Sequence, residues 1–153
     1  MRNLTDREWE AHVWLSRMWG AEGELESYKA GMERVISQLS GIGKYDAEFV
    51  PAQTGENSVE TKYLNYSQFR EKHEKLMWEI MAANNHTAEI IAKVGDRKMR
   101  GMLFDRYIER LSWAKIGEKY HYAQRQPYYY MHKCLAEVRR FIPDEEILEV
   151  IND

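Results

Sequence analysis

Apolar residues recur in steps of three and four along two long stretches of the chain, and this spacing is the strongest constraint on its fold. Such steps place side chains on one face of an α-helix, whereas a strand needs alternation. The two seams comprise Ala11, Trp14, Met18, Ala21, Leu25, Tyr28, Met32, Val35 and Leu39, and then Tyr66, Phe69, His73, Leu76, Ile80, Ala83, Thr87, Ile90 and Val94. Because only three prolines interrupt the chain, we predict an all-α fold.

Two seams of similar length predict a long, coiled-coil-like helical hairpin over residues 1–95. A seam of this kind requires a partner helix. The two helices therefore pair either within one chain or between chains, and the second arrangement gives a homodimer. The hairpin is expected to serve oligomerisation or contact with a partner.

Local signals place the ends of the two long helices. Thr5 and Glu8 form a capping-box pattern at the start of the first helix. Gly20 and Gly23 weaken that helix, and a break is expected near them. Glycines and a proline in residues 40–57 predict a loop, after which the second helix begins near Asn57 or Ser58.

The net charge of −3 conceals a basic segment. Residues 1–95 carry 11 Lys and Arg against 15 Asp and Glu, residues 96–142 carry 11 against 5, and residues 143–153 carry none against 5. A basic block of this kind attracts anionic polymers through counterion release. We therefore expect a nucleic-acid-binding domain at residues 96–142. The acidic tail, residues 143–153, is expected to form a short helix or to fray.

Three short helices are expected in the basic block, over residues 97–110, 113–120 and 124–141. Asp96 is the predicted N-cap of the first helix and Ser112 of the second. A helix-turn-helix needs two helices joined by a short turn, with polar and basic side chains at the start of the second. The last two helices meet this description, so residues 96–142 are predicted to be a DNA-binding helix-turn-helix domain.

Residues 124–141 are the predicted recognition helix, and Gly117 in the preceding helix leaves room for its close approach. The inward stripe comprises Pro127, Tyr130, Cys134, Leu135 and Val138. The residues expected to contact double-stranded DNA are Gln124, Arg125, Gln126, Tyr128, Tyr129, His132 and Lys133, together with Lys115 of the preceding helix. Arginine can read guanine and glutamine can read adenine, while tyrosine and lysine suit phosphates.

A family resemblance supports this interpretation. The elements Arg106-Tyr107-Ile108, Ser112-Trp113, Ile116-Gly117, Tyr122, Arg125-Gln126 and Leu135 resemble the region-four domain of bacterial sigma factors, and in particular the RinA/ArpU family of phage transcriptional regulators. The chain departs from the pattern at Ala123, where serine or threonine is usual, and at Pro127. The resemblance implies a three-helix sigma-region-four-like domain that regulates phage late genes in the cytoplasm of a bacterial host. It also implies RNA polymerase as a candidate partner.

Two other functions remain open. A small terminase-like DNA-packaging subunit also joins a helix-turn-helix to a helical oligomerisation hairpin, and a coiled-coil assembly protein would never meet DNA. A stable ring of many copies would indicate packaging, whereas a monomer or dimer would indicate regulation.

The sequence offers no enzymatic motif. It has no phosphate-binding loop, dinucleotide fingerprint or nucleophile motif. His121, His132 and Cys134 lie close together but lack a fourth metal ligand, and Asp46 and Glu48 lack a paired acidic motif. We therefore expect neither an enzyme nor a metal or other cofactor. The single cysteine and the absence of an apolar span predict a cytoplasmic protein.

Overall fold

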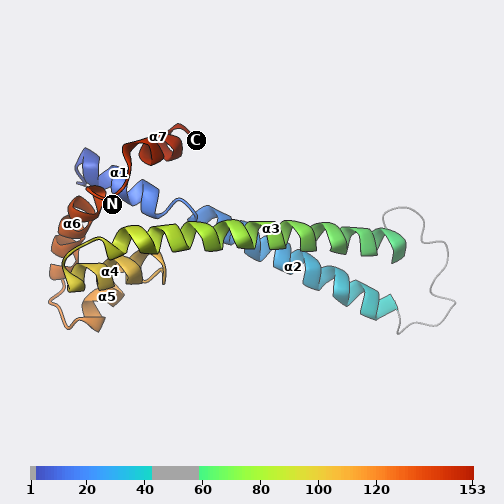
Figure 1. Cartoon of the computed structure of the whole chain (residues 1–153). Coiled ribbons are helices and arrows are strands. Elements are labelled where there is room, and N and C mark those ends of the chain that lie inside the picture. The colour runs from blue at the N-terminus through green and yellow to red at the C-terminus, as the bar shows by residue number, and fades with distance from the viewer. Residues whose placement is uncertain (1–2, 43–58) are drawn as a thin grey trace. The chain divides into compact units, whose positions relative to one another are not determined.

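The computed structural model describes residues 3–42 and 59–153, and all the regular structure in these residues is helical (Figure 1). The expected all-α fold is therefore confirmed. The helices are α1 (Asp6–Leu15), α2 (Trp19–Ile42), α3 (Val59–Ala92), α4 (Arg97–Tyr107), α5 (Trp113–Lys119), α6 (Gln126–Arg139) and α7 (Asp144–Asn152). None of them combines the length and the apolar composition that crossing a bilayer requires.

Part of the predicted loop can be compared with the structure. Residues 40–42 belong to the end of α2 rather than to a loop. The rest of the predicted loop lies outside the described residues, as do Asp46, Glu48 and the expected helix start at Asn57 or Ser58.

The chain divides into two compact units. The core unit comprises Met1–Met18 and Ala82–Asp153, and the hairpin unit comprises Trp19–Met81. We expected boundaries after residue 95 and after residue 142. The structure divides the chain differently because α1 packs against α6 and α7 of the C-terminal part, so the first helix belongs to the core unit.

Helix α1 begins at the predicted capping box. The Thr5 hydroxyl accepts a hydrogen bond from the Glu8 amide at 3.2 Å, and the Glu8 carboxylate accepts one from the Thr5 amide at 3.2 Å. Ala11 and Trp14 are at most 1% exposed. Their burial against the C-terminal helices explains why α1 is part of the core unit.

The first long helix is broken upstream of the position we expected. It ends at Leu15, and residues 16–18 form a turn, whereas Gly20 and Gly23 lie inside α2. Ser16 donates its hydroxyl to the His12 carbonyl at 2.7 Å, and the Arg17 guanidinium donates to the Trp14 carbonyl at 2.9 Å. The Ser16 and Arg17 amides donate to the same two carbonyls, so the side chains reinforce a turn that ends the helix before Gly20 and Gly23 are reached.

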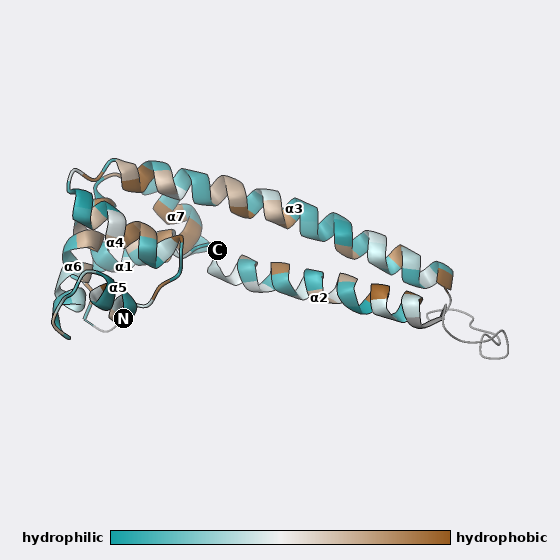
Figure 2. Ribbon diagram, turned by 90° about the horizontal axis from the view of Figure 1, so that it is seen from below, coloured by the Kyte–Doolittle hydropathy of each residue, from teal (hydrophilic) through white to brown (hydrophobic). Residues whose placement is uncertain are grey.

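Helices α2 and α3 run antiparallel within the hairpin unit. A Cβ placed on Gly31 would lie 3.1–3.2 Å from the Phe69 ring, and a shallow hollow is lined by Glu24 and Tyr28 of α2 with residues 72–79 of α3. Higher numbers on α2 thus meet lower numbers on α3. Figure 2 shows the apolar residues of both helices as short patches between hydrophilic stretches. Few side chains of this unit are buried, Val35 and Ile80 being the buried aliphatic ones.

Side-chain pairs attach α1 and α7 to the rest of the core unit. His132 of α6 lies 2.8 Å from the Glu8 carboxylate of α1, and His86 of α3 lies 2.7 Å from Glu146 of α7. Arg139, 5% exposed, donates to both Glu10 and Asp144 at 3.3 and 2.8 Å. The acidic tail is therefore a packed helix, with Ile147 buried beneath it.

Candidate nucleic-acid interface

The helix-turn-helix segment is built around α5 and α6. Ser112 caps α5, accepting a hydrogen bond from the Lys115 amide at 3.2 Å, and Asp96 caps α4 through the Met99 amide. Both predicted N-caps are confirmed. Helix α4 ends at Tyr107, earlier than expected, and Arg110 beyond it adopts a φ of 66° that no α-helix allows.

Helix α6 begins at Gln126, two residues after its predicted start. The Gln126 side chain accepts a hydrogen bond from the Ala123 amide at 3.0 Å and so closes the turn that a serine or threonine would otherwise cap. Pro127 then falls in the first turn of the helix, where the missing N–H is harmless. Gln126 thus adds a hydrogen bond at the turn where Ala123 has no capping side chain, and α6 tolerates Pro127 where it stands.

Close packing holds α6 against α5. A Cβ on Gly117 would collide with the Pro127 ring, so the glycine at this position permits the approach that the sequence predicted. Of the predicted inward stripe, Pro127 is buried, Tyr130 is half-buried, and Cys134, Leu135 and Val138 are fully buried. Met131 adds a further buried residue. This packing turns the opposite face of α6 to solvent.

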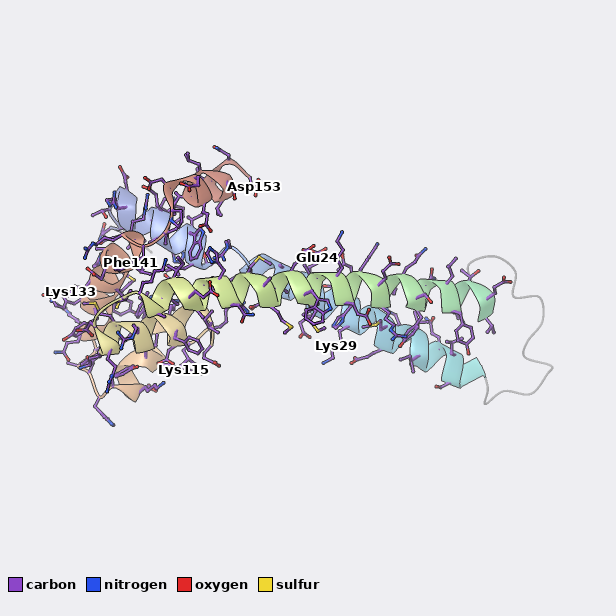
Figure 3. All side chains as sticks on the ribbon, in the orientation of Figure 1. Glu24, Lys29, Lys115, Lys133, Phe141 and Asp153 are labelled. Carbon is purple, nitrogen blue, oxygen red and sulfur yellow. The ribbon has the colours of Figure 1, made fainter. Side chains whose placement is uncertain are left out.

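Most of the predicted DNA-contacting residues are exposed. Tyr128 and Tyr129 are 51% and 59% exposed. The other exposed members of the set are Gln124, Arg125, Gln126 and Lys133 at the start and on the outward face of α6, and Lys115 on α5 (Figure 3). His132 stands apart, because it is tied to Glu8 on the side that faces α1.

Glu8 and His132 form an electrostatic link between α1 and α6. Burial alone would raise the pKa of the Glu8 carboxyl, but hydrogen bonds from His132 and from the Thr5 backbone outweigh it and leave the pKa lowered. The Glu8 carboxylate is therefore charged and is held by His132 and Thr5. Its negative charge lies on the side of α6 that faces α1, away from the outward face.

Ion pairing separates the cations of the basic block into two groups. Lys119 pairs with the buried Asp105 at 2.8 Å, Arg139 with Glu10 and Asp144, and Arg140 with Glu137 at 2.9 Å. Among the described residues, no carboxylate pairs with the exposed cations Arg97, Lys98, Lys115, Arg125 and Lys133. The uncompensated positive charge therefore lies on α4, α5 and the first half of α6.

A tyrosine stack adjoins these free cations, and sequence reasoning missed it. The Tyr122 and Tyr130 rings stack at 5.0 Å with an interplanar angle of 11°, and Tyr120 continues the stack at 6.1 Å from Tyr122. The Lys98 ammonium lies 4.5 Å from the centre of the Tyr122 ring, and the Lys133 ammonium lies 4.6 Å from that of Tyr129. Periodicity within one helix cannot reveal contacts among α4, the turn and α6.

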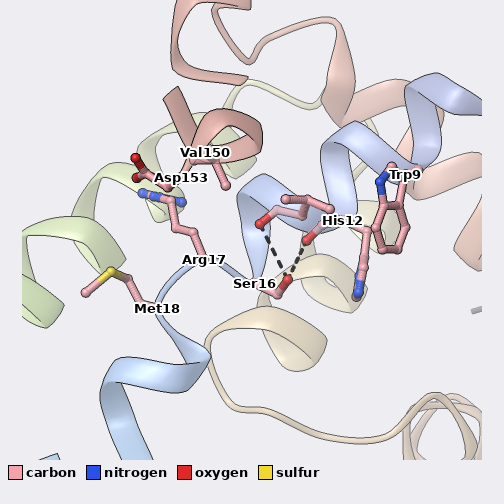
Figure 4. A pocket seen from close by; sticks show the side chains of 8 residues that line it. Trp9, His12, Ser16, Arg17, Met18, Val150 and Asp153 are labelled. Atoms are coloured by element: carbon pink, nitrogen blue, oxygen red, sulfur yellow. Dashed lines mark hydrogen bonds between the residues drawn. The ribbon is translucent and has the colours of Figure 1, made fainter. Parts of the chain in front are cut away.

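Another hollow of the core unit lies away from these free cations, and the cation that lines it is already hydrogen-bonded. It encloses about 470 Å³ between α1 and the end of α7, with Trp9, His12 and Val150 among its walls (Figure 4). Its cation, Arg17, already donates to Trp14, Thr87 and Ala83. An anionic ligand would have to displace these bonds, so the hollow is a poor binding site compared with the free cations on α6.

The described residues contain neither a cluster of metal ligands nor a reactive thiol. No three His, Cys, Asp or Glu side chains gather there as a metal site would require. Burial raises the pKa of the Cys134 thiol to about 12, so the group remains a protonated, apolar part of the core.

Comparison with protein-family models, with curated proteins and with solved structures finds no match to this chain.

Proposed function

We propose that the chain is a sequence-specific double-stranded-DNA-binding transcriptional regulator in which α6 enters the major groove. The observation that carries the proposal is the set of exposed, unpaired cations and polar residues on the outward face of α6, on the side opposite the buried Cys134, Leu135 and Val138. An α-helix fits the major groove, and its exposed N-terminal residues reach base edges there.

Each exposed residue has a role in this proposal. Arg125 is suited to a forked contact with guanine, and Gln124 and Gln126 to adenine. Lys115, at the start of α5, is suited to a backbone phosphate beside the groove. The Gln126 side chain already bonds the Ala123 amide through its oxygen, so its amide NH₂ remains the group that could donate to a base.

Regulation of phage late genes, with contact to RNA polymerase, is the part of the proposal that rests on the resemblance to sigma region four and the RinA/ArpU regulators. It adds a biological role to the DNA-binding chemistry. Late-gene promoters are the first duplexes to test for it.

Substitution of Arg125 tests the DNA-binding proposal. Duplexes selected from a random pool should bind wild type, and Arg125→Ala should lower specific affinity by about ten- to a hundred-fold, as expected for one lost bidentate base contact. Arg140→Ala is the matched control, because Arg140 is the C-cap residue of the same helix but is paired with Glu137. An unchanged footprint in Arg125→Ala, with the circular dichroism of wild type, would contradict the assigned recognition helix.

A homodimer formed through the hairpin unit is a second part of the proposal. Tyr63, Leu64 and Trp78 are 58–64% exposed in that unit, and exposed apolar residues of this size favour association. The same observation also suits a small terminase-like packaging subunit. Sedimentation distinguishes the two, since a dimer supports the regulator and a closed ring of many copies supports the packaging subunit.

A further inference from the structure

Two lysines from different helices converge on one group of tyrosines. Lys98 lies in the first turn of α4 and Lys133 near the middle of α6. Their ammonium groups lie 5.7 Å and 5.9 Å from the centre of the same ring, that of Tyr130. Tyr122, from the turn between α5 and α6, stacks on Tyr130 and carries Lys98 over its own face.

The aromatic rings fix the positions of these cations. An ammonium over an aromatic face is attracted by the ring quadrupole and gives up rotamer freedom to stay there. The neighbouring Tyr122 phenol raises the pKa of Lys98, and the neighbouring Tyr129 phenol raises the pKa of Lys133. Both lysines are therefore charged, and both are exposed.

The two cations lie around the same ring, and Asp96 at the start of α4 is near enough to Lys98 to contribute to the rise in its pKa. Neither lysine forms an ion pair within the described part of the chain, although two like charges repel. An external anion that contacts both lysines would offset this repulsion. Both ammonium groups lie within about 6 Å of the centre of the Tyr130 ring, so at most about 12 Å separates them. One DNA strand carries a phosphate for about every 3.4 Å of helix axis, so both lysines could reach phosphates of a single strand.

We propose that Lys98 and Lys133 form a clamp for the phosphate backbone of one DNA strand, and that Tyr122 is the residue that positions Lys98 in it. This inference rests on the proposed DNA binding and adds to it a subsite outside the base-reading residues. The clamp spans α4 and α6, so it fixes how deeply α6 sits in the groove while carrying no sequence information of its own.

The salt dependence of binding tests the clamp. Log affinity of the full chain for a selected duplex is measured against log salt concentration for wild type, Lys98→Gln, Lys133→Gln and the double variant. Each phosphate contact contributes about 0.9 to the slope, so each single variant should lower its magnitude by about 0.9 and the double variant by about 1.8. Lys75→Gln, an exposed lysine of the hairpin unit, is the control and should leave the slope unchanged.

Substitution of Tyr122 tests its positioning role. Tyr122→Leu should weaken binding by about two- to five-fold, the value of one exposed cation–π contact, and Tyr122→Phe should retain most of that affinity because the ring remains. In a Lys98→Gln background, Tyr122→Leu should have no further effect, since the cation that it positions is gone. A purely structural role for Tyr122 would weaken binding equally in both backgrounds.

The outcomes separate this inference from the proposed function. Wild type that binds no duplex at low salt overturns the proposed function itself. Wild-type binding with unchanged slopes in Lys98→Gln and Lys133→Gln overturns the clamp alone. Both variants alter exposed side chains, so the salt slopes decide the question even if Tyr122→Leu fails to fold.

Discussion

In the core unit the apolar side chains of Trp14, Val94 and Leu135 are at most 1% exposed, whereas in the hairpin unit those of Leu64 and Trp78 are 58% and 64% exposed. Both units consist of helices with the same spacing of apolar residues. In the core unit α6 packs against α1, α4 and α5, and α7 packs against α1. Two antiparallel helices alone bury few side chains between them, so periodicity produces helices but an extensive core needs further elements around it.

The difference bears on how each unit could act. A rigid core holds the exposed residues of α5 and α6 in fixed positions, as a DNA-reading surface requires. The hairpin unit keeps apolar surface exposed, which suits the proposed association with a second copy. The comparison predicts that equivalent substitutions in the two units have unequal effects on stability.

A leucine pair gives the largest expected contrast. Leu135→Ala removes a fully buried side chain and should destabilise the protein by about 2–5 kcal/mol, through lost burial and the cavity left behind. Leu64→Ala, the same chemical change at an exposed site, should alter the free energy of unfolding of the monomer by less than about 0.5 kcal/mol. Urea unfolding followed by circular dichroism measures both, and equal losses would refute the contrast between the units.

A glycine pair gives the next contrast. Gly117→Ala places a methyl group against the Pro127 ring, whose attachment to the α6 backbone prevents it from moving aside, and should cost about 1–3 kcal/mol. Gly23→Ala meets open space within α2 and should stabilise that helix by up to about 1 kcal/mol. Thermal unfolding shows whether each substitution raises or lowers the melting temperature. If Gly117→Ala were as stable as wild type, α5 and α6 could move apart without loss of stability.

The smallest expected effect is a pH dependence that tests whether α1 belongs to the core unit. Because the folded-state pKa of Glu8 is lowered, its stabilisation is present above the ordinary carboxyl pKa and is lost as pH falls through the lower folded value. The loss should be of order 1 kcal/mol, the net value of a hydrogen bond.

Glu8→Gln is the control for the pH experiment. Glutamine keeps an acceptor for the Thr5 amide but does not titrate, so the acid-side slope of stability against pH should flatten. Identical acid titrations of the two proteins would show that the link between Glu8 and His132 does not hold α1 in place.

Several features could be predicted because they depend on neighbours in sequence. The caps at Thr5, Asp96 and Ser112 act within three residues. The two apolar seams are also confirmed, since all their members are buried or half-buried. The start of α6 was placed two residues early, because Gln126 caps the turn with its own side chain.

Other features could not be predicted, because they join distant segments. The place of α1 in the core unit depends on His132 and Arg139, more than a hundred residues away in sequence. The seam positions gave no sign that residues 16–18 interrupt the helix, because a turn there keeps Met18 half-buried. Residue types alone also could not show that His132 would bond the Glu8 carboxylate, whereas the neighbouring Lys133 would form no ion pair.

The amino-acid sequence by itself determined the helices, their inward faces and the segregation of positive charge into residues 96–142, since these follow from spacing, capping and composition. Only the tertiary structure decided which cations remain unpaired and which tyrosines gather around Lys98 and Lys133. The physical reason is range: helical periodicity and capping act over a few residues, whereas ion pairing and ring stacking depend on where the packed core brings separate helices together.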